Sequence, residues 1–270
     1  MTQPTHISIS QINKFTSCQR SWWLEKIAGE QQVAGSSARR GNLFDQAIAF
    51  DLGLLKKAEP AELDKLTKEQ IQANKIADDL SKANEVELKE ARIFEATEAY
   101  RTQGGWTVAD EAQKEIRLTK NQWGTLQQIY GVNFDLWLPI VGYIDLFRKD
   151  PLNPFQTELL DLKTSERAEY RPSWSLQCVL YCLATGATKF GIHLVTFTKQ
   201  IKLNKYSYRP NRNTFTWAMN VVGETSQRMK QVAKETAAER IPATAGYHCA
   251  WCSKQVSCEA ALAGCLVKEE

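Results

Sequence analysis

Apolar residues recur at helical spacing in the first part of the chain. We expect a first helix over residues 11–27, capped by Ser8 or Ser10 and with Cys18 in its middle. A second helix is expected over residues 38–55, because its apolar side chains recur every three or four positions. From there to about position 103 the chain is rich in Lys, Glu, Asp and Ala, with only an intermittent apolar stripe. That pattern predicts a charged helical insert.

The pattern changes from helical to strand-like after position 110. Short apolar runs bounded by turn residues are typical of strands, and longer runs with a period near 3.6 are typical of helices. The order of these runs predicts an α/β fold with a mixed sheet flanked by helices. In chain order we expect strands over residues 111–118, 133–138, 141–148, 157–164, 189–198 and 204–208, and helices over residues 174–183 and 213–239.

Length and composition predict one large globular domain over residues 1–270. Of the 270 residues, 43% are hydrophobic and 24% are charged, which is ordinary for a folded domain. The net charge is only +3, so any surface that binds a nucleic acid must come from local basic patches. The expected parts of the domain are the N-terminal helices (1–55), the helical insert (56–105), the central core (106–209), and the long helix with a cysteine cluster (210–270).

Hydropathy and the number of cysteines help to predict the cellular compartment of the protein. The N-terminal residues show no basic stretch followed by an apolar one, so we expect no secretory signal. No apolar run approaches the roughly 20 residues that span a bilayer. We therefore expect a cytoplasmic protein, of a cell or a phage, with no membrane partner. Seven cysteines, an odd number, favour metal binding or ordinary burial over a disulfide framework.

The most informative polar residues lie between positions 141 and 181. Asp145 interrupts an apolar strand, and a buried carboxylate requires a metal ion or a cationic partner. Asp161 and Lys163 are two apart in the next strand, so their side chains project to the same face. Gln177 and Tyr181 are four apart in the following helix and also share a face.

These residue types suit the hydrolysis of a phosphodiester, which requires an activated water and neutralisation of charge at phosphorus. One or two Mg²⁺ or Mn²⁺ ions held by carboxylates can supply both. Lys163 is placed to orient the water or to offset charge in the transition state. Taken singly, each residue favours a structural role, but their order and spacing together favour catalysis. The candidate metal ligands are Asp45, Asp145, Asp161 and the backbone carbonyl of Leu162.

A second group of candidate ligands lies near the C-terminus. Cys249, Cys252 and Cys258 place three thiols at close spacing, and Cys18 is the candidate for a fourth ligand. Four thiolates suit zinc or an iron–sulfur cluster, and three with His248 also suit zinc, so the spacing leaves both metals open. Either metal would tie the two ends of the chain together.

Residues 142–181 resemble the PD-(D/E)XK nuclease superfamily, and specifically its RecB-like exonuclease branch. A further stretch, from Arg40 to Asp45, resembles the first motif of that branch, with Asp45 in place of the usual histidine. The other matching motifs are Gly142-x-x-Asp145, Asp161-x-Lys163 and Gln177-x-x-x-Tyr181.

The resemblance implies a restriction-endonuclease-like fold and a role for each matching residue. It implies that Asp145 and Asp161 bind metal and that Lys163 is catalytic. It also implies that Gln177 and Tyr181 shape the site and hold DNA. The expected activity is that of a Mg²⁺- or Mn²⁺-dependent DNA exonuclease in recombination, repair or phage DNA processing. Its expected partners are single-stranded or duplex DNA ends and a helicase or recombinase.

The cysteine pattern is similar to that of the iron–sulfur members of the branch, which include AddB and the CRISPR-associated exonucleases. One cysteine precedes the nuclease motifs, and Cys-x2-Cys-x5-Cys follows them. In those proteins the ligands hold a structural [4Fe–4S] cluster. The resemblance therefore implies such a clasp, formed by Cys18, Cys249, Cys252 and Cys258.

Two other functions are open at this point. In CRISPR adaptation a similar nuclease trims spacer precursors beside an integrase, although Asp45 mildly disfavours that role. A non-catalytic iron–sulfur DNA-binding subunit would keep the cluster and lose hydrolysis. The joint presence of both strand aspartates, Lys163 and Gln177 argues against such a loss.

Overall fold

The contacts within the chain divide it into two compact units, each built from separate segments. The first comprises Met1–Val33, Ile116–Gly142 and Asn211–Glu270, and the second comprises Ala34–Glu115 and Tyr143–Pro210. The expected single domain over the whole chain stays a prediction. The computed structural model describes residues 4–30, 36–51, 92–105, 111–149, 157–167, 169, 173–245, 249, 252 and 258.

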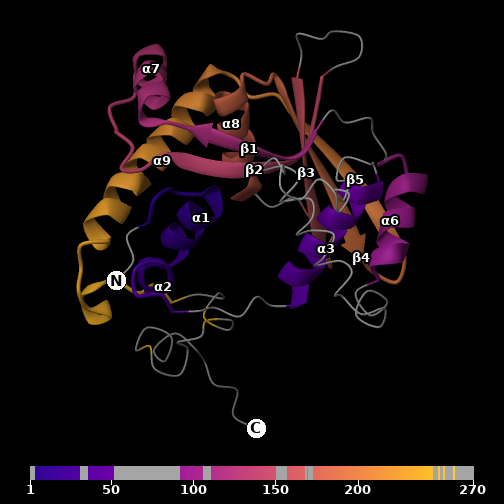
Figure 1. Ribbon diagram of the computed structural model, residues 1–270, viewed down its shortest axis with the longest axis horizontal. Helices are drawn as coiled ribbons and strands as arrows, with labels where there is room; N and C mark the ends of the chain where they lie inside the picture. Colours follow the sequence, from indigo (N-terminus) through magenta and orange to yellow (C-terminus); the bar gives the residue numbers. More distant parts are fainter. Residues whose placement is uncertain are drawn as a thin grey trace, which may run out of the picture. The chain divides into compact units, whose positions relative to one another are not determined.

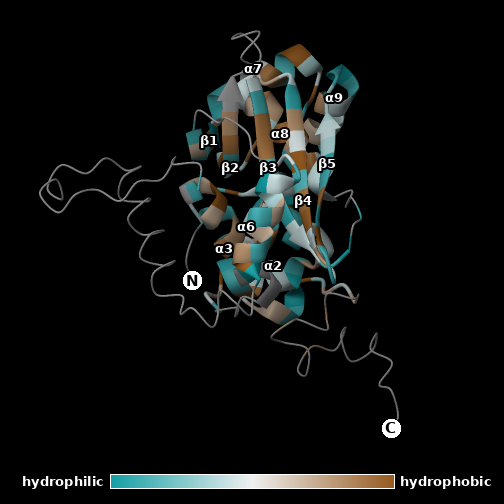
Figure 2. Cartoon of the chain, turned by 90° about the vertical axis from the view of Figure 1, so that its right-hand side faces the viewer, coloured by the Kyte–Doolittle hydropathy of each residue, from teal (hydrophilic) through white to brown (hydrophobic). Residues whose placement is uncertain are grey.

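A five-stranded mixed sheet is the centre of the fold (Figure 1). Its strands are β1 (Glu111–Leu118), β2 (Ile140–Lys149), β3 (Thr157–Ser165), β4 (Lys189–Phe197) and β5 (Ile201–Tyr208). They lie in the order β1-β2-β3-β4-β5. β2 is antiparallel to β3, β3 is parallel to β4, and β4 is antiparallel to β5, which confirms the predicted mixed sheet. β3 and β4 are buried along most of their length and are largely brown in Figure 2, whereas β1 is mostly teal.

Helices of the second unit cover both faces of this sheet. On one face, α3 (Ser36–Asp51) and α6 (Ile93–Thr102) form a core with the strands. The parallel strands β3 and β4 need a crossover, and α8 (Ser173–Thr185) provides it. The ring of Tyr181 on α8 lies 6.3 Å from that of Phe190 on β4, which places α8 on the other face. The core under α3 and α6 includes Leu43, Phe44, Ile48, Tyr100, Leu160, Leu162 and Val195.

The first helix of the chain is interrupted, so the prediction of one continuous helix over residues 11–27 is wrong. Two helices are present, α1 (Ile9–Ser17) and α2 (Gln19–Lys26). Cys18 separates them because its backbone is extended, with φ −159° and ψ 110°. Ser8 caps α1 by accepting a hydrogen bond from the Gln11 N–H, which is one of the two caps expected.

The strand expected over residues 133–138 is absent from the described residues, and side chains bind its backbone instead. The indole N–H of Trp123 donates to the carbonyl of Phe134 across 2.7 Å. The N–H of Trp137 donates to the Ser226 hydroxyl across 2.8 Å. The segment is therefore held by side chains, and no neighbouring strand pairs with it among the residues described.

Two further helices of the first unit differ from expectation. α7 (Lys120–Tyr130) was not predicted, although its Thr119–Gln122 capping box is visible in the sequence. α9 (Arg212–Val232) ends seven residues before the predicted end. The chain then turns, and the Trp23 indole donates to the carbonyl of Glu235 across 3.2 Å. A short 3₁₀ turn, η2 (Ala238–Arg240), follows.

Most of the expected helical insert at 56–105 lies outside the described residues, which resume at residue 92 with α6 at its end. Cys265 also lies outside them. In the part of the chain that the structure describes, no helix combines the length and apolar character needed to cross a bilayer.

Candidate active site

Asp145 lies where the antiparallel pairing of β2 and β3 ends. The paired residues run from Lys149–Thr157 to Leu146–Leu160. Beyond them, the N–H of Leu162 donates to Oδ2 of Asp145 across 2.7 Å. A side-chain carboxylate thus takes the place of a backbone acceptor, and this contact holds Asp145 against the strand that carries Asp161 and Lys163.

Asp161 is the best-connected carboxylate of the site. Only 2% of its surface is exposed, and its Oδ2 forms an ion pair with the Nζ of Lys163. Its Oδ1 accepts a hydrogen bond of 2.7 Å from Nε2 of Gln177 on α8. Leu162 between them points into the core on the opposite face, as the alternation of a strand predicts. A buried carboxylate with both a cation and an amide donor is compensated for the loss of its contacts with water.

Tyr181 lies one helical turn beyond Gln177 and is buried. It hydrogen-bonds Gln177, and burial raises the pKa of its hydroxyl, followed by the effect of the Asp161 charge. Tyr181 therefore contacts the carboxylates through Gln177, which suits a role in shaping the site. The contact with DNA that the family resemblance implies for Tyr181 stays a prediction.

Asp45 reaches this cluster because α3 approaches β3 closely. At Gly41, one turn before Asp45, an added Cβ atom would stand 3.2 Å from the Thr164 hydroxyl oxygen. A side chain at that position would therefore crowd the Thr164 hydroxyl. The Oδ1 atom of Asp45 is buried and has no hydrogen-bond partner among the residues that the structure describes. An orphaned carboxylate oxygen of this kind is costly unless a cation joins it.

The charges of the site act on one another. Burial, followed by the charge of Asp161, raises the pKa of Asp145 to about 7. Burial, followed by the charge of Asp145, raises the pKa of Asp45 well above its usual range. Burial alone would lower the pKa of Lys163, but the carboxylates outweigh it, and the net shift is upward. The three aspartates and one lysine therefore form a single electrostatic cluster, in which carboxyl groups outnumber the cation.

The residues of this cluster fit a hard divalent cation. Their donors are carboxylate oxygens, which Mg²⁺ and Mn²⁺ prefer. The mutual repulsion of the carboxylates when they are ionised and the orphaned oxygen of Asp45 are both features that a cation would relieve. Among the described residues, however, no three His, Cys, Asp or Glu side chains are already gathered as a metal site. The assignment of Asp45, Asp145, Asp161 and the Leu162 carbonyl as ligands stays a prediction.

The candidate cluster ligands Cys18, Cys249, Cys252 and Cys258 lie in the first unit as free thiols. Arg20 connects their segments, because its Nη1 lies 4.0 Å from the Cys258 Sγ and its Nε donates to the carbonyl of Ile241 across 3.0 Å. The start of α2 therefore lies beside Cys258 and Ile241. Four thiols fit an iron–sulfur cluster or zinc. The described thiols are not assembled into a group of three, so the cluster also stays a prediction.

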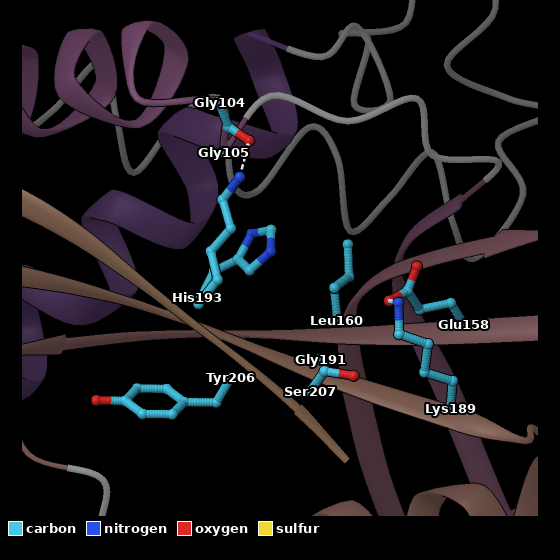
Figure 3. Close-up of a pocket in the computed structure, with 10 residues that line it drawn as sticks. Gly104, Gly105, Glu158, Leu160, Lys189, Gly191, His193, Tyr206 and Ser207 are labelled. Carbon is cyan, nitrogen blue, oxygen red and sulfur yellow. Dashed lines mark hydrogen bonds and ion pairs between the residues drawn. The ribbon is translucent and has the colours of Figure 1, made fainter. Parts of the chain in front are cut away.

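A cavity of about 290 Å³ is lined in part by Leu160 and His193 (Figure 3). Because side chains alternate along β3, this cavity lies on the face of the sheet opposite Asp161. Its charged groups already have partners. Lys189 pairs with Glu158 across 2.7 Å at one end, and Lys205 donates to the carbonyl of Gly104 at the other. Because these cations are engaged and the hydrolytic residues face away, the cavity is not the candidate active site.

The sequence reasoning missed one residue that acts on the cluster. The side chain of Gln113, on β1, partly offsets the rise in the pKa of Asp145. A single polar residue in an edge strand that is mostly polar gives no signal of this effect.

Comparison with known proteins adds one finding about the family. A family model described as the PD-(D/E)XK nuclease superfamily matches residues 6–259. No curated protein matches the chain. The crystal structure of SSO0001 is 12% identical, covers 96% of this chain and 88% of its own, and has a TM-score of 0.44. A structure from Eubacterium rectale described as "Putative exonuclease" is 12% identical, covers 98% of this chain and 90% of its own, and has a TM-score of 0.47. At these scores neither structure supports a statement about this chain.

Proposed function

The chain belongs to the PD-(D/E)XK nuclease superfamily, and we propose that it is a divalent-metal-dependent deoxyribonuclease that degrades DNA from its ends. One observation supports the hydrolytic site most directly. Asp161 is contacted at the same time by Lys163 from its own strand and by Gln177 from α8. Asp145 is bound to the same strand through the Leu162 N–H.

The proposed ligands of the metal are Asp145 and Asp161, with Asp45 and the Leu162 carbonyl beside them. When bound, Mg²⁺ or Mn²⁺ supplies Lewis acidity and an activated water. Lys163 keeps its proton because the neighbouring carboxylates raise its pKa. It therefore suits the role of a fixed cation that orients the attacking water and offsets negative charge at phosphorus.

Gln177 and Tyr181 act behind the reacting groups in this proposal. Gln177 fixes the orientation of Asp161 by donating to its Oδ1, which leaves the direction of that carboxylate set before substrate arrives. Tyr181 in turn hydrogen-bonds Gln177 and packs against Phe190. The helix α8 thus supports the carboxylate from the face opposite the α3 core.

We further propose that Cys18, Cys249, Cys252 and Cys258 hold a structural [4Fe–4S] cluster. The break of the helix at Cys18 supports this, because an extended residue there turns the thiol out of the helical repeat. The contacts of Arg20 with the C-terminal segment support it as well. In this proposal the substrate is single-stranded or duplex DNA, the chain acts as one domain, and the partner is a helicase, recombinase or integrase in DNA recombination, repair or phage DNA processing.

The experiment that tests the proposal uses the full chain, purified without oxygen. End-labelled single-stranded and duplex DNA are incubated with the protein in Mn²⁺, in Mg²⁺ and in a chelator. We expect metal-dependent shortening from the ends and a loss of about 10²- to 10⁴-fold in rate for Lys163→Ala. Lys202→Ala, which removes an exposed lysine of β5, is the matched control and should keep full activity. Equal rates for the wild type and Lys163→Ala would show that a contaminant does the cutting.

A further inference from the structure

Tyr143 is an exposed aromatic residue beside the candidate active site. It lies two positions before Asp145 in β2, and 50% of its surface is exposed. Ile144 and Leu146, on either side of Asp145, are both buried. Because side chains alternate along a strand, Tyr143 and Asp145 project from the same face of β2. The ring of Tyr143 therefore stands next to a proposed metal ligand.

The spacing of these two residues suits the repeat of a nucleic-acid strand. Residues two apart in a β-strand are separated by about 7 Å, which is roughly the length of two stacked nucleotides along one DNA strand. A strand whose phosphate lies at the carboxylate cluster therefore carries a base within reach of Tyr143. Aromatic side chains bind unpaired bases of any sequence by stacking, because every base has a π-face.

The hydroxyl of Tyr143 decides which part of a DNA strand its ring suits. It donates to Oε2 of Glu115 on β1 across 3.3 Å. A contact through the hydroxyl holds the edge of the ring, and stacking uses its faces. The carboxylate of Glu115 at the tip of the ring repels phosphate. The chemistry at Tyr143 therefore favours a base over the sugar–phosphate backbone.

We propose that Tyr143 stacks on an unpaired nucleobase of the DNA strand that enters the candidate active site. The inference rests on the proposed nuclease function and deepens it, because it names strands with unpaired ends as the preferred substrate. A base stacks on a side chain only after it has left its partner and its neighbours in a duplex. A single-stranded end needs no such opening, so it binds more readily.

The competing explanation is that Tyr143 only joins β2 to the edge strand β1 through Glu115. Tyr143→Phe keeps the ring and removes this hydrogen bond, whereas Tyr143→Ala removes both. If the role is only structural, both variants lose thermal stability, and neither loses affinity that depends on the bases of DNA. If Tyr143 stacks on a base, Tyr143→Ala loses that affinity and Tyr143→Phe keeps it.

The test measures equilibrium binding of DNA to the full chain by fluorescence anisotropy, with thermal unfolding as the check of folding. Ca²⁺ replaces Mg²⁺, because it also takes oxygen ligands, and a gel verifies that the DNA stays intact. The probes are a single-stranded oligonucleotide, an abasic strand of the same length and a blunt duplex. We expect Tyr143→Ala to bind the single strand about 5- to 150-fold more weakly, the range for the loss of one stacked base.

The other probes and variants show whether this loss depends on an unpaired base. Tyr143→Ala should bind the abasic strand like the wild type, and its loss on the blunt duplex should be smaller than on the single strand. Tyr143→Phe should bind all three probes like the wild type. Phe94→Ala removes an aromatic residue of α6 that is 62% exposed, so it is the matched control and should also bind like the wild type.

The outcomes separate this inference from the proposed function. Unchanged binding of the single strand by folded Tyr143→Ala overturns the inference, whatever the nuclease assay gives. An equal loss on the abasic strand or on the duplex overturns it too, and so does an equal loss in Tyr143→Phe. A loss that requires unpaired bases supports it, even if the wild type cuts no DNA, and in that case only the proposed function fails. A wild type that binds none of the three probes overturns both.

Discussion

The backbone N–H of Leu162 donates to the carboxylate of Asp145 across 2.7 Å, at the point where β2 and β3 stop pairing. This contact attaches a proposed metal ligand to the sheet. The carboxylate satisfies a backbone group that the separating strands leave without a backbone acceptor at that point. Function and stability therefore depend on the same side chain, and substitutions at Asp145 can separate the two.

We expect Asp145→Asn and Asp145→Ala to abolish metal-dependent cleavage alike and to differ in stability. Both remove the charge, but only asparagine keeps an oxygen that can accept from the Leu162 N–H. Alanine leaves that N–H unsatisfied, at a cost of about 1–3 kcal/mol. Urea unfolding in the presence of a chelator should show Asp145→Ala to be less stable than Asp145→Asn by that amount. Equal stability would mean that water replaces the carboxylate at Leu162.

The metal-free protein should lose stability as the pH rises, through the same carboxyl. Burial and the Asp161 charge raise the pKa of Asp145 from 3.8 to about 7, so the folded protein holds this proton more tightly than the unfolded chain does. The protonated carboxyl of Asp145 contributes its full stabilisation to the folded protein below pH 3.8. This contribution declines between pH 4 and 7 and is lost above pH 7. The stability of the wild type relative to Asp145→Asn should fall across that window, measured by urea unfolding in a chelator.

Divalent cations provide the control for this pH effect. At pH 8 a bound cation stabilises the ionised carboxylates, so added Mg²⁺ should raise the melting temperature of the wild type. The same addition should leave the melting temperature of Asp145→Asn nearly unchanged. A wild type whose stability relative to Asp145→Asn is flat from pH 4 to 8 would contradict the raised pKa.

The sequence was sufficient to predict most elements of the sheet, because buried strands have long apolar runs. β3 and β4 are the clearest cases, since both faces of each strand are covered. It was not sufficient at Cys18, where the residues on both sides favour a helix and only the backbone angles show the break. The sequence around Phe134 also led to a wrong prediction, that of a strand. The partners of this segment are the side chains of Trp123 and Ser226, whose positions depend on tertiary packing.

The candidate site shows the same division. The spacing of Asp161 and Lys163 in a strand predicts a shared face, and the structure joins them in an ion pair. The contact of Gln177 with Asp161 follows from the crossover helix, which two parallel strands require. The left-handed backbone of Gln113 was not predicted, because the neighbouring residues give no signal of it. Local periodicity predicts which residues of one helix or strand share a face, but it does not predict irregularities of the backbone.

Replacing Gln177 by leucine should lower both stability and activity. Its amide donates to a carboxylate that is only 2% exposed, and a hydrogen bond to a buried charge contributes about 1.5–3 kcal/mol. Gln127→Leu removes a similar amide–carboxylate contact with Asp135, but on the surface, and should cost less than about 0.5 kcal/mol. Chemical unfolding and the rate of DNA cleavage measure the two effects. A Gln177→Leu protein as stable and active as Gln127→Leu would remove Gln177 from the site.

The cysteine clasp is tested by comparing two substitutions near the C-terminus. Cys258 is one of the four proposed ligands, and Arg20 lies against its sulfur, whereas Cys265 falls outside the ligand pattern. Protein purified without oxygen should be brown, absorb broadly near about 400 nm, and contain iron and sulfide. Cys258→Ser should lose most of the iron and melt at a lower temperature, because the link between the chain ends is gone. Cys265→Ser should keep both properties. If the wild-type protein is colourless and contains zinc, the same thiols hold zinc and not an iron–sulfur cluster.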